Sequence, residues 1–214
     1  LLRDLMQRSE LVLREHPVNV ERRSRGDIPA SMIWLFWGSG RVPDMPPFQQ
    51  IFGLEAAVTS AVDVIRGLAG MMGMRILEIA GVKDGLDNDF AGQAFGALAA
   101  LGEYDLVVIH VEATDEAGHT GSIGNKIEAI QRVDGEIVSR LRSWQPNALR
   151  VLILPDHPTP VKTRTHSPDP VPFMLWGPGF TSNRGKRFTE SAAAKTGLFI
   201  DPGYNIMSKL VGKS

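Results

Sequence analysis

The stretch D-L-V-V-I-H-V-E-A-T-D-E-A-G-H, residues 105–119, joins an apolar segment to a polar one. Its first seven residues, 105–111, form a mostly continuous apolar run, which is typical of a strand buried on both faces of a parallel sheet. Asp115 and His119 follow that strand, and Gly118 favours a tight loop that folds both side chains toward one ion. Because sites in parallel sheets lie at the carboxyl ends of strands, this stretch predicts a metal site there.

Apolar strands alternate with helices along the rest of the chain. The strands lack the alternating pattern of a half-exposed sheet, so we expect a mostly parallel central sheet in a three-layer α/β/α sandwich. The helix predicted at residues 125–144 carries apolar side chains on one face, from Ile127 and Ile130 to Leu141. The remaining strands are expected at residues 31–37, 56–59, 75–79, 150–154 and 172–176, and the other helices at 1–15, 62–69, 90–101 and 203–211.

Size and composition exclude several classes of protein. The chain has 214 residues, of which 43% are hydrophobic, enough for one α/β domain or one domain with an appendage. A net charge of −1 gives no basic excess for nucleic acid, and no apolar run reaches the ~20 residues of a membrane helix. The absence of cysteine excludes disulfides and cysteine metal sites, and it fits a reducing cytoplasm.

A second and a third polar segment accompany later strands. Asp156 and His157 directly follow the strand at residues 150–154, and prolines on both sides of the pair restrict the backbone there. Adjacent side chains in a strand point to opposite faces, so both can face one site only if the chain turns at this pair. His166 lies in a polar, proline-bounded loop before the final strand. Each segment alone also fits a helix cap, a strand-end turn or a solvated histidine.

Together the three segments offer five metal ligands. Carboxylate and neutral imidazole form the ligand set that suits Mn²⁺, Zn²⁺ or a similar divalent ion. A pair of such ions clamps the attacking and leaving oxygens of a displacement at phosphorus. The combination therefore points to phosphoryl chemistry rather than to a structural zinc site. The five residues are Asp115, His119, Asp156, His157 and His166.

Two further residues are candidates beside these ligands. His110 lies within the strand at residues 105–111, where it either orients a ligand through a hydrogen bond or is a satisfied core histidine. Arg22 lies in a basic loop after the first helix, where it either binds substrate phosphate or carboxylate as a bidentate fork or is solvated.

Several motifs carry a resemblance to one family. I-H-V-E-A-T-D-E-A-G-H-T-G begins at Ile109, D-H-P-T-P at Asp156 and T-H-S-P-D-P-V-P-F at Thr165, while H-P-V-N-x-x-R begins at His16. With these motifs the chain resembles, over nearly its whole length, the cofactor-independent phosphoglycerate mutases of the archaeal type, within the alkaline phosphatase superfamily. The resemblance implies an alkaline phosphatase-like fold.

The resemblance also implies roles for the five ligand candidates. Asp115, His119 and His166 would hold one divalent ion, and Asp156 and His157 would hold the second. The two ions would be Mn²⁺, with Zn²⁺, Co²⁺ or Mg²⁺ as alternatives, and 2,3-bisphosphoglycerate would not be needed. The expected partner is a small phosphorylated substrate in the cytoplasm, with no nucleic acid and no membrane. The sequence carries no signal for the oligomeric state.

The family interconverts 3-phosphoglycerate and 2-phosphoglycerate through a phosphoserine, in glycolysis and gluconeogenesis. The resemblance implies that the serine nucleophile and a further aspartate ligand belong to an N-terminal segment that is not visible in this sequence. Residues 1–18 are then expected to be the remnant of an inserted substrate domain and its linker. Residues 19–214 are expected to be the metal-binding phosphatase-type core, lacking its N-terminal strand and nucleophile loop.

The sequence leaves other functions open. Another phosphatase, phosphodiesterase or phosphopentomutase of the same superfamily would have a similar ligand pattern, and a non-catalytic module would retain only a vestigial metal site. Glu55 bears on both alternatives, because family members often carry G-L-K-G-A where this chain has G-L-E-A-A. If that lysine binds phosphate, a glutamate in its place opposes binding.

If the catalytic serine lies outside these 214 residues, the purified chain should interconvert the two phosphoglycerates slowly or not at all, because no activated nucleophile is present. An enolase-coupled assay in the presence of Mn²⁺ measures this rate. Robust turnover by the purified chain would contradict the assignment of the nucleophile to another segment.

Overall fold

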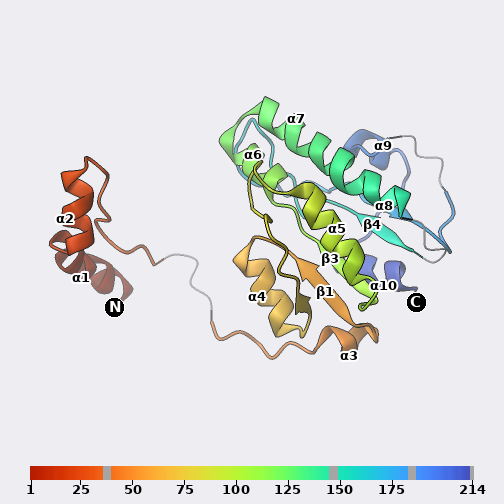
Figure 1. Ribbon diagram of the computed structural model, residues 1–214, viewed down its shortest axis with the longest axis horizontal. Coiled ribbons are helices and arrows are strands. Elements are labelled where there is room, and N and C mark those ends of the chain that lie inside the picture. The colour runs from red at the N-terminus through yellow and green to blue at the C-terminus, as the bar shows by residue number, and fades with distance from the viewer. Residues whose placement is uncertain (36–39, 145–148, 183–186, 213–214) are drawn as a thin grey trace. The chain divides into compact units, whose positions relative to one another are not determined.

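The computed structural model forms two compact units, Leu1–Asp44 and Met45–Ser214 (Figure 1). The first unit holds the helices α1 (Leu2–Arg14) and α2 (Pro17–Ser24). The buried Asn19 joins its parts, because its Nδ2 donates to the carbonyl oxygens of Leu13 (2.7 Å) and Ala30 (2.8 Å). The residues that the structure describes are 1–35, 40–144, 149–182 and 187–212.

Two predictions in the first unit are wrong. The expected basic loop after the first helix is the helix α2, because His16 Nδ1 accepts from the Val18 N–H (3.3 Å) and proline occupies the first helical position. Residues 31–35 form no strand and are exposed, while 36–37 lie outside the described residues. An apolar run becomes a strand only where a neighbour takes up its backbone hydrogen bonds. The Ile33 N–H instead donates to the Ser9 hydroxyl of α1 (3.0 Å).

The second unit is built around a parallel sheet, as predicted. Its three strands lie in the order β2-β1-β3, and all four residues of the central strand are buried. One helix follows β1 and another precedes β3, which gives the crossover connections that parallel strands require. The register pairs Thr59 with Ile109, so β1 and β3 end at the same edge. The elements are β1 (Ala56–Thr59), α4 (Asp63–Met71), β2 (Arg75–Ile76), α5 (Phe90–Ala100) and β3 (Leu106–Ile109).

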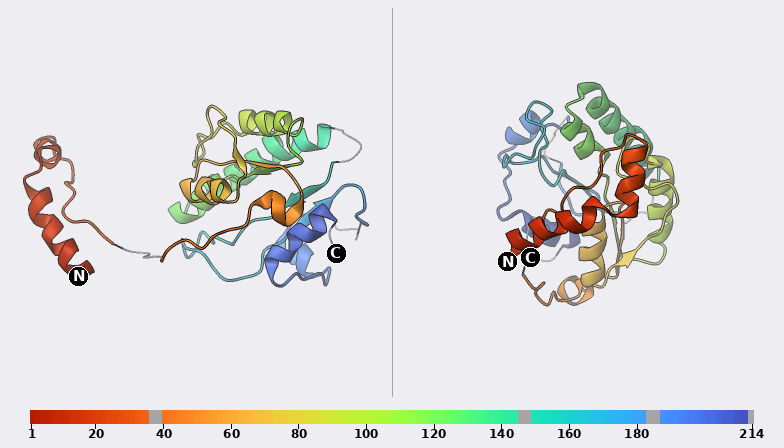
Figure 2. Two further views of the ribbon diagram at one scale, coloured as in Figure 1. Left: turned by 90° about the horizontal axis from the view of Figure 1, so that it is seen from below. Right: turned by 90° about the vertical axis from the view of Figure 1, so that its left-hand side faces the viewer.

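Helices cover the sheet. Helix α5 contacts β1 and β3, and α4 contacts β1 and β2. Helix α10 lies on the opposite side of the strands from α5 in the left view of Figure 2, and its Ile206 and Leu210 are buried. The other short helices of this unit are α3 (Phe48–Phe52), α9 (Glu190–Ala194), the 3₁₀ turn η2 (Gly203–Asn205) and α10 (Ile206–Val211).

The last two strands differ from the predicted single sheet. Strands β4 (Val151–Ile153) and β5 (Met174–Trp176) pair with each other in antiparallel fashion and form a separate two-stranded sheet. A parallel pair needs a crossover helix between its strands. Residues 154–173 form no helix and return the chain as a long loop, so the antiparallel arrangement results.

The long helix predicted at residues 125–144 exists as three consecutive segments. Its apolar face is only partly buried: Ile127 and Ile130 are each 52% exposed, whereas Ala129 and Ile137 are buried. The middle segment is a π-helix, whose wider turn rotates the face that follows it relative to the face before it. The segments are α7 (Ile123–Arg132), η1 (Val133–Val138) and α8 (Ser139–Ser143).

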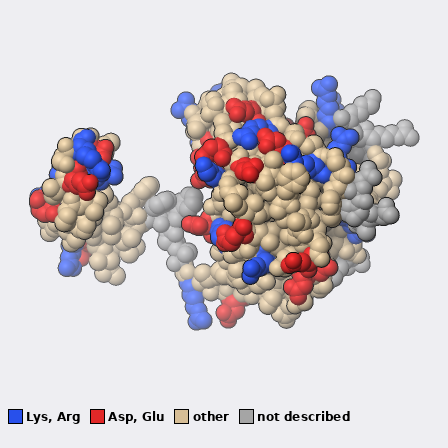
Figure 3. Space-filling model, in the orientation of Figure 1, with Lys and Arg blue, Asp and Glu red and all other residues tan. Residues whose placement is uncertain are grey.

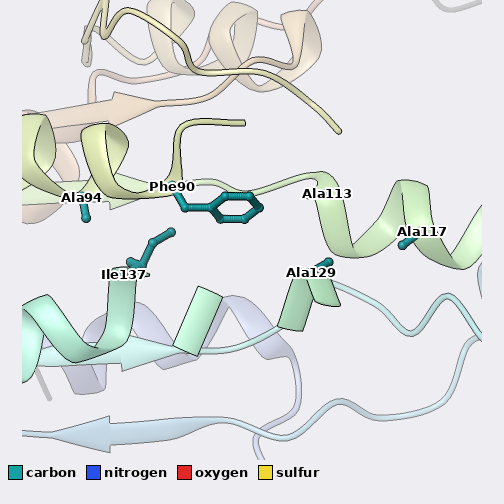
Figure 4. Packing of buried hydrophobic residues seen from close by; sticks show 6 residues of the cluster. All are labelled: Phe90, Ala94, Ala113, Ala117, Ala129 and Ile137. Carbon is teal, nitrogen blue, oxygen red and sulfur yellow. The ribbon is translucent and has the colours of Figure 1, made fainter. Parts of the chain in front are cut away.

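The main hydrophobic core lies between α5, the long helix and α6 (Ala113–Thr120), as Figure 4 shows. Phe90 at the start of α5 is completely buried and is its largest member, and Ile137 packs against it from η1. The remaining members are alanines, which allow the helices to approach closely. They are Ala94, Ala113, Ala117 and Ala129.

The surface of the second unit carries both signs of charge. Figure 3 shows lysine and arginine interspersed with aspartate and glutamate on the visible face of this unit. None of the described helices combines the length and the apolarity that crossing a bilayer requires.

Replacing Phe90 by alanine should lower the free energy of unfolding by about 3–5 kcal/mol, because the change leaves a cavity in the core. Phe199→Ala is the matched control, since this phenylalanine is 71% exposed and its loss should cost less than about 0.5 kcal/mol. Urea denaturation of both variants measures the difference. Equal stability losses would contradict the placement of the core.

Candidate metal centre

Helix α6 presents the first two ligand candidates. Asp115 and His119 lie one turn apart on it, not in the predicted tight loop, and Asp115 Oδ2 is 3.0 Å from His119 Nε2. Gly118 serves a different purpose from the one expected. A Cβ on this glycine would lie 2.5 Å from the Thr159 carbonyl oxygen, so glycine lets another segment pack directly against the helix.

That other segment begins with Asp156 and His157, where the chain bends as predicted. The bend brings the two side chains together, with His157 Nε2 3.1 Å from Asp156 Oδ2. The His157 N–H also donates to Asp156 Oδ1 (2.9 Å). The Asp156 side chain is 74% exposed, whereas that of His157 is 30% exposed.

His166, nine residues further along, closes the cluster. Its Nε2 lies 3.5 Å from Asp115 Oδ1 and 3.1 Å from His119 Nε2. Its ring also faces that of His157, with 3.7 Å between the ring centroids. The structure therefore brings together all five residues that the sequence marks as ligands, and their role as ligands stays a prediction.

The separations among Asp115, His119 and His166 fit a divalent ion. Bonds of ~2.1 Å at angles of 90–109° place neighbouring ligand atoms about 3.0–3.4 Å apart. The observed distances are 3.0 Å from Asp115 Oδ2 to His119 Nε2, 3.1 Å between the two histidine Nε2 atoms, and 3.5 Å from Asp115 Oδ1 to His166 Nε2. Each residue turns a potential electron-pair donor toward the others, so a cation between them would relieve their mutual repulsion.

The backbone fixes how His119 faces this point. Its Nδ1 lies 3.0 Å from the Arg164 carbonyl oxygen, so Nδ1 carries a hydrogen and Nε2 is left to face the cluster. That carbonyl, aided by the charges of Asp115 and Glu116, raises the pKa of the His119 imidazole. Arg164 has a φ of 54°, in the left-handed region, and this uncommon conformation belongs to the turn that presents its carbonyl.

Two supporting residues were not predicted as part of the site. Thr159 is 5% exposed, and its hydroxyl donates to Asp115 Oδ1 and lies 3.3 Å from His157 Nδ1. It thereby bridges the two halves of the cluster. Lys126 on α7 donates to the carbonyl oxygens of Thr114 (2.6 Å) and Thr159 (3.5 Å), and burial lowers its pKa. The only signal for Thr159 was its place in D-H-P-T-P.

His110 lies just beyond β3, at the same edge of the sheet. Its Nδ1 is 2.9 Å from the Ser60 hydroxyl and its Nε2 is 3.4 Å from Glu112 Oε2. Burial lowers the pKa of His110, against the charges of Asp156 and Asp115, which favours the neutral ring. Its influence on a ligand stays a prediction.

Glu55 lies at the far end of β1 from the cluster, and Arg22 belongs to the first unit. Glu55 immediately precedes β1, at the amino end of the strand, and accepts a hydrogen bond from Gln49 Nε2 (2.5 Å). The strand rise of ~3.3 Å per residue separates it from Ser60, at the end of the strand that faces the cluster, by about 16 Å. Arg22 belongs to the first unit, where its Nε donates to the Ile28 carbonyl (2.8 Å), and its contact with substrate stays a prediction.

Comparison with known proteins assigns the family. A family model described as the metalloenzyme superfamily matches residues 8–210. The chain belongs to the metalloenzyme superfamily. Membership agrees with the ligand chemistry of the cluster and supports dependence on a divalent metal.

Curated relatives within this superfamily cover nearly all of the chain. It is 44% identical to the 2,3-bisphosphoglycerate-independent phosphoglycerate mutase of Methanothrix thermoacetophila, over 99% of this chain and 54% of the relative. It is also 44% identical to the corresponding mutase 2 of Methanothermobacter thermautotrophicus, over 96% and 51%. The resemblance seen in the motifs is thus confirmed. The chain spans about half the length of the curated relatives it matches.

Solved structures confirm the fold class. A protein from Pyrococcus horikoshii has a TM-score of 0.80 and 29% identity, covering 98% of this chain and 56% of that one. The cofactor-independent phosphoglycerate mutase of Thermoplasma acidophilum has a TM-score of 0.65 and 22% identity, covering 97% and 49%. This metalloenzyme superfamily member therefore has the predicted alkaline phosphatase-like α/β fold.

Thr159→Val keeps the size of the side chain but removes the hydroxyl that orients Asp115, so it should weaken Mn²⁺ binding by about tenfold. Thr159→Ser retains the hydroxyl and should bind nearly as tightly as the unsubstituted chain. Isothermal titration with Mn²⁺ compares the three proteins. Equal affinities in all three would show that the hydroxyl does not support the site.

Proposed function

We propose that this chain supplies the metal centre of a cofactor-independent phosphoglycerate mutase, which interconverts 3-phosphoglycerate and 2-phosphoglycerate. The convergence of Asp115, His119 and His166, with Asp156 and His157 beside them, is the observation that carries the proposal. The choice of reaction rests on two relatives that are 44% identical to this chain and are named as phosphoglycerate mutases. The chain spans about half the length of those relatives, so the mutase activity of the complete protein is proposed here from its similarity to them.

Each side chain has a definite task in this proposal. Asp115, His119 and His166 hold one divalent ion, and Asp156 and His157 hold the second. When bound, such ions lower the pKa of a coordinated hydroxyl and neutralise charge on phosphoryl oxygens. The Arg164 carbonyl and the Thr159 hydroxyl keep His119 and Asp115 turned toward the first ion.

The remaining details of the proposal follow from the ligand types and the relatives. Mixed carboxylate and imidazole ligands favour Mn²⁺, with Zn²⁺, Co²⁺ or Mg²⁺ as alternatives. The substrate is a small phosphate ester, 2,3-bisphosphoglycerate is not required, and the reaction takes place in the cytoplasm. Residues 1–18 are assigned to the remnant of a substrate domain and its linker, and residues 19–214 to the phosphatase-type core, with Arg22 as a substrate contact.

The number of bound ions tests the metal centre. Titration with Mn²⁺ should reveal two sites, and Asp115→Asn should abolish most of the binding at the tighter one. Glu55→Gln is the matched control, because it makes the same carboxylate-to-amide change at the opposite end of β1 from the cluster. Binding of one ion or none favours a module with a vestigial site.

Substrate choice tests the mutase assignment. The Mn²⁺-loaded chain should bind 3-phosphoglycerate more tightly than ribose 1-phosphate, as measured by competition calorimetry, and the metal-free chain should bind neither. Preference for the pentose phosphate would favour a phosphopentomutase, and equal binding of both would favour an unspecific phosphatase.

A further inference from the structure

Three side chains beside the proposed metal centre lie in a row of close contacts. Ser60 follows β1, His110 follows β3, and Glu112 precedes α6. The Ser60 hydroxyl lies 2.9 Å from His110 Nδ1, and His110 Nε2 lies 3.4 Å from Glu112 Oε2. The three residues come from three segments that the parallel register of β1 and β3 brings to one edge.

The hydrogens in this row have one consistent order. The Ser60 oxygen accepts from the Val62 N–H (3.0 Å), which leaves its own hydrogen able to point to His110 Nδ1. A neutral imidazole that accepts at Nδ1 carries its hydrogen on Nε2. A hydrogen on Nε2 would lie on the side of Glu112, whose Oε2 is 3.4 Å from that nitrogen. The Gln93 amide also donates to the His110 carbonyl (2.9 Å), which fixes the backbone beneath the ring.

Ser60 is placed to orient and not to attack. A serine nucleophile must reach its substrate, whereas Ser60 is 2% exposed. Glu112, at the other end of the row, has a partly exposed side chain with 24% relative accessibility. The row therefore begins in the interior and ends at the cluster.

Glu112 faces the first group of ligands. One of its carboxylate oxygens lies within 4.8 Å of a carboxylate oxygen of Asp115. A negative charge at this distance repels Asp115 in the absence of a cation and attracts a cation that Asp115 holds. The energy of that attraction depends on the distance between the carboxylate and the ion, which the neighbouring His110 ring helps to set.

We propose that Glu112 is an additional anionic group that strengthens divalent-metal binding at Asp115, and that Ser60 and His110 are positioning residues that aim it. This inference rests on the proposed function, because it requires a cation at the cluster. Neither Ser60 nor Glu112 belongs to the ligand set predicted from the sequence.

Mn²⁺ titration of single variants tests the proposal. Glu112→Gln should weaken binding by about tenfold, the lower end of the effect of groups that support metal ligands. The amide nitrogen of a glutamine side chain lies near the position of the histidine Nε2 atom, so it can take the place of Nε2 beside Glu112. The amide group of the shorter asparagine lies near the position of Nδ1 and does not reach Glu112. His110→Gln should therefore bind nearly as well as the unsubstituted chain, and His110→Asn should bind several-fold more weakly.

A double-mutant cycle separates positioning from general damage to the fold. His110→Asn should weaken binding in the unsubstituted chain and have no further effect when combined with Glu112→Gln. The thermal midpoint of each metal-free variant checks that all of them fold. A loss from His110→Asn that is the same with and without Glu112→Gln overturns the positioning role.

The outcomes also distinguish this proposal from the proposed function. If the unsubstituted chain binds Mn²⁺ and Glu112→Gln binds it equally well, the role of Glu112 is refuted while the metal centre stands. If the unsubstituted chain binds no Mn²⁺, Zn²⁺, Co²⁺ or Mg²⁺, both proposals are refuted.

Discussion

The parallel pairing of β1 with β3 is the constraint on which the site depends. Its register places Thr59 opposite Ile109, so the residues that follow, Ser60 and His110, emerge side by side at one edge. Only residues 110–112 separate β3 from α6; Glu112 immediately precedes that helix and Asp115 lies in its first turn. A shift of this register by one residue would move Ser60 away from His110, so backbone hydrogen bonds in the sheet determine side-chain geometry at its edge.

A second contact completes the cluster from a distant part of the sequence. The loop after β4 packs on α6 because Gly118 leaves room for the Thr159 backbone. This contact lets the Thr159 hydroxyl reach Asp115 and lets the Arg164 carbonyl reach His119. The two halves of the proposed metal centre are thus joined by hydrogen bonds that need no bound ion, which is a form of preorganisation.

The sequence predicted the strands around the site and all five clustered residues, because continuous apolar runs and strand-end polar residues are local signals. It missed the helix at Asp115, since Gly118 reads as a loop residue when the segment packed against it is unknown. It placed a strand at 31–37 and a single amphipathic face on the helix at 125–144, because an apolar pattern does not reveal whether a partner surface is present or whether a π-turn rotates the helix. Thr159 and Ser60 act through contacts 44 and 50 residues away along the chain, which no local pattern records.

The two aspartates of the cluster differ sharply in their access to water. The Asp115 side chain is 17% exposed and that of Asp156 is 74% exposed. Mobile ions in solution screen an exposed charge strongly and a sheltered one weakly, with a Debye length of about 8 Å at physiological ionic strength. In the proposed metal centre, rising salt concentration would therefore loosen the hold of Asp156 on a cation before that of Asp115, so the ionic medium alone would change the occupancy of one position without the other.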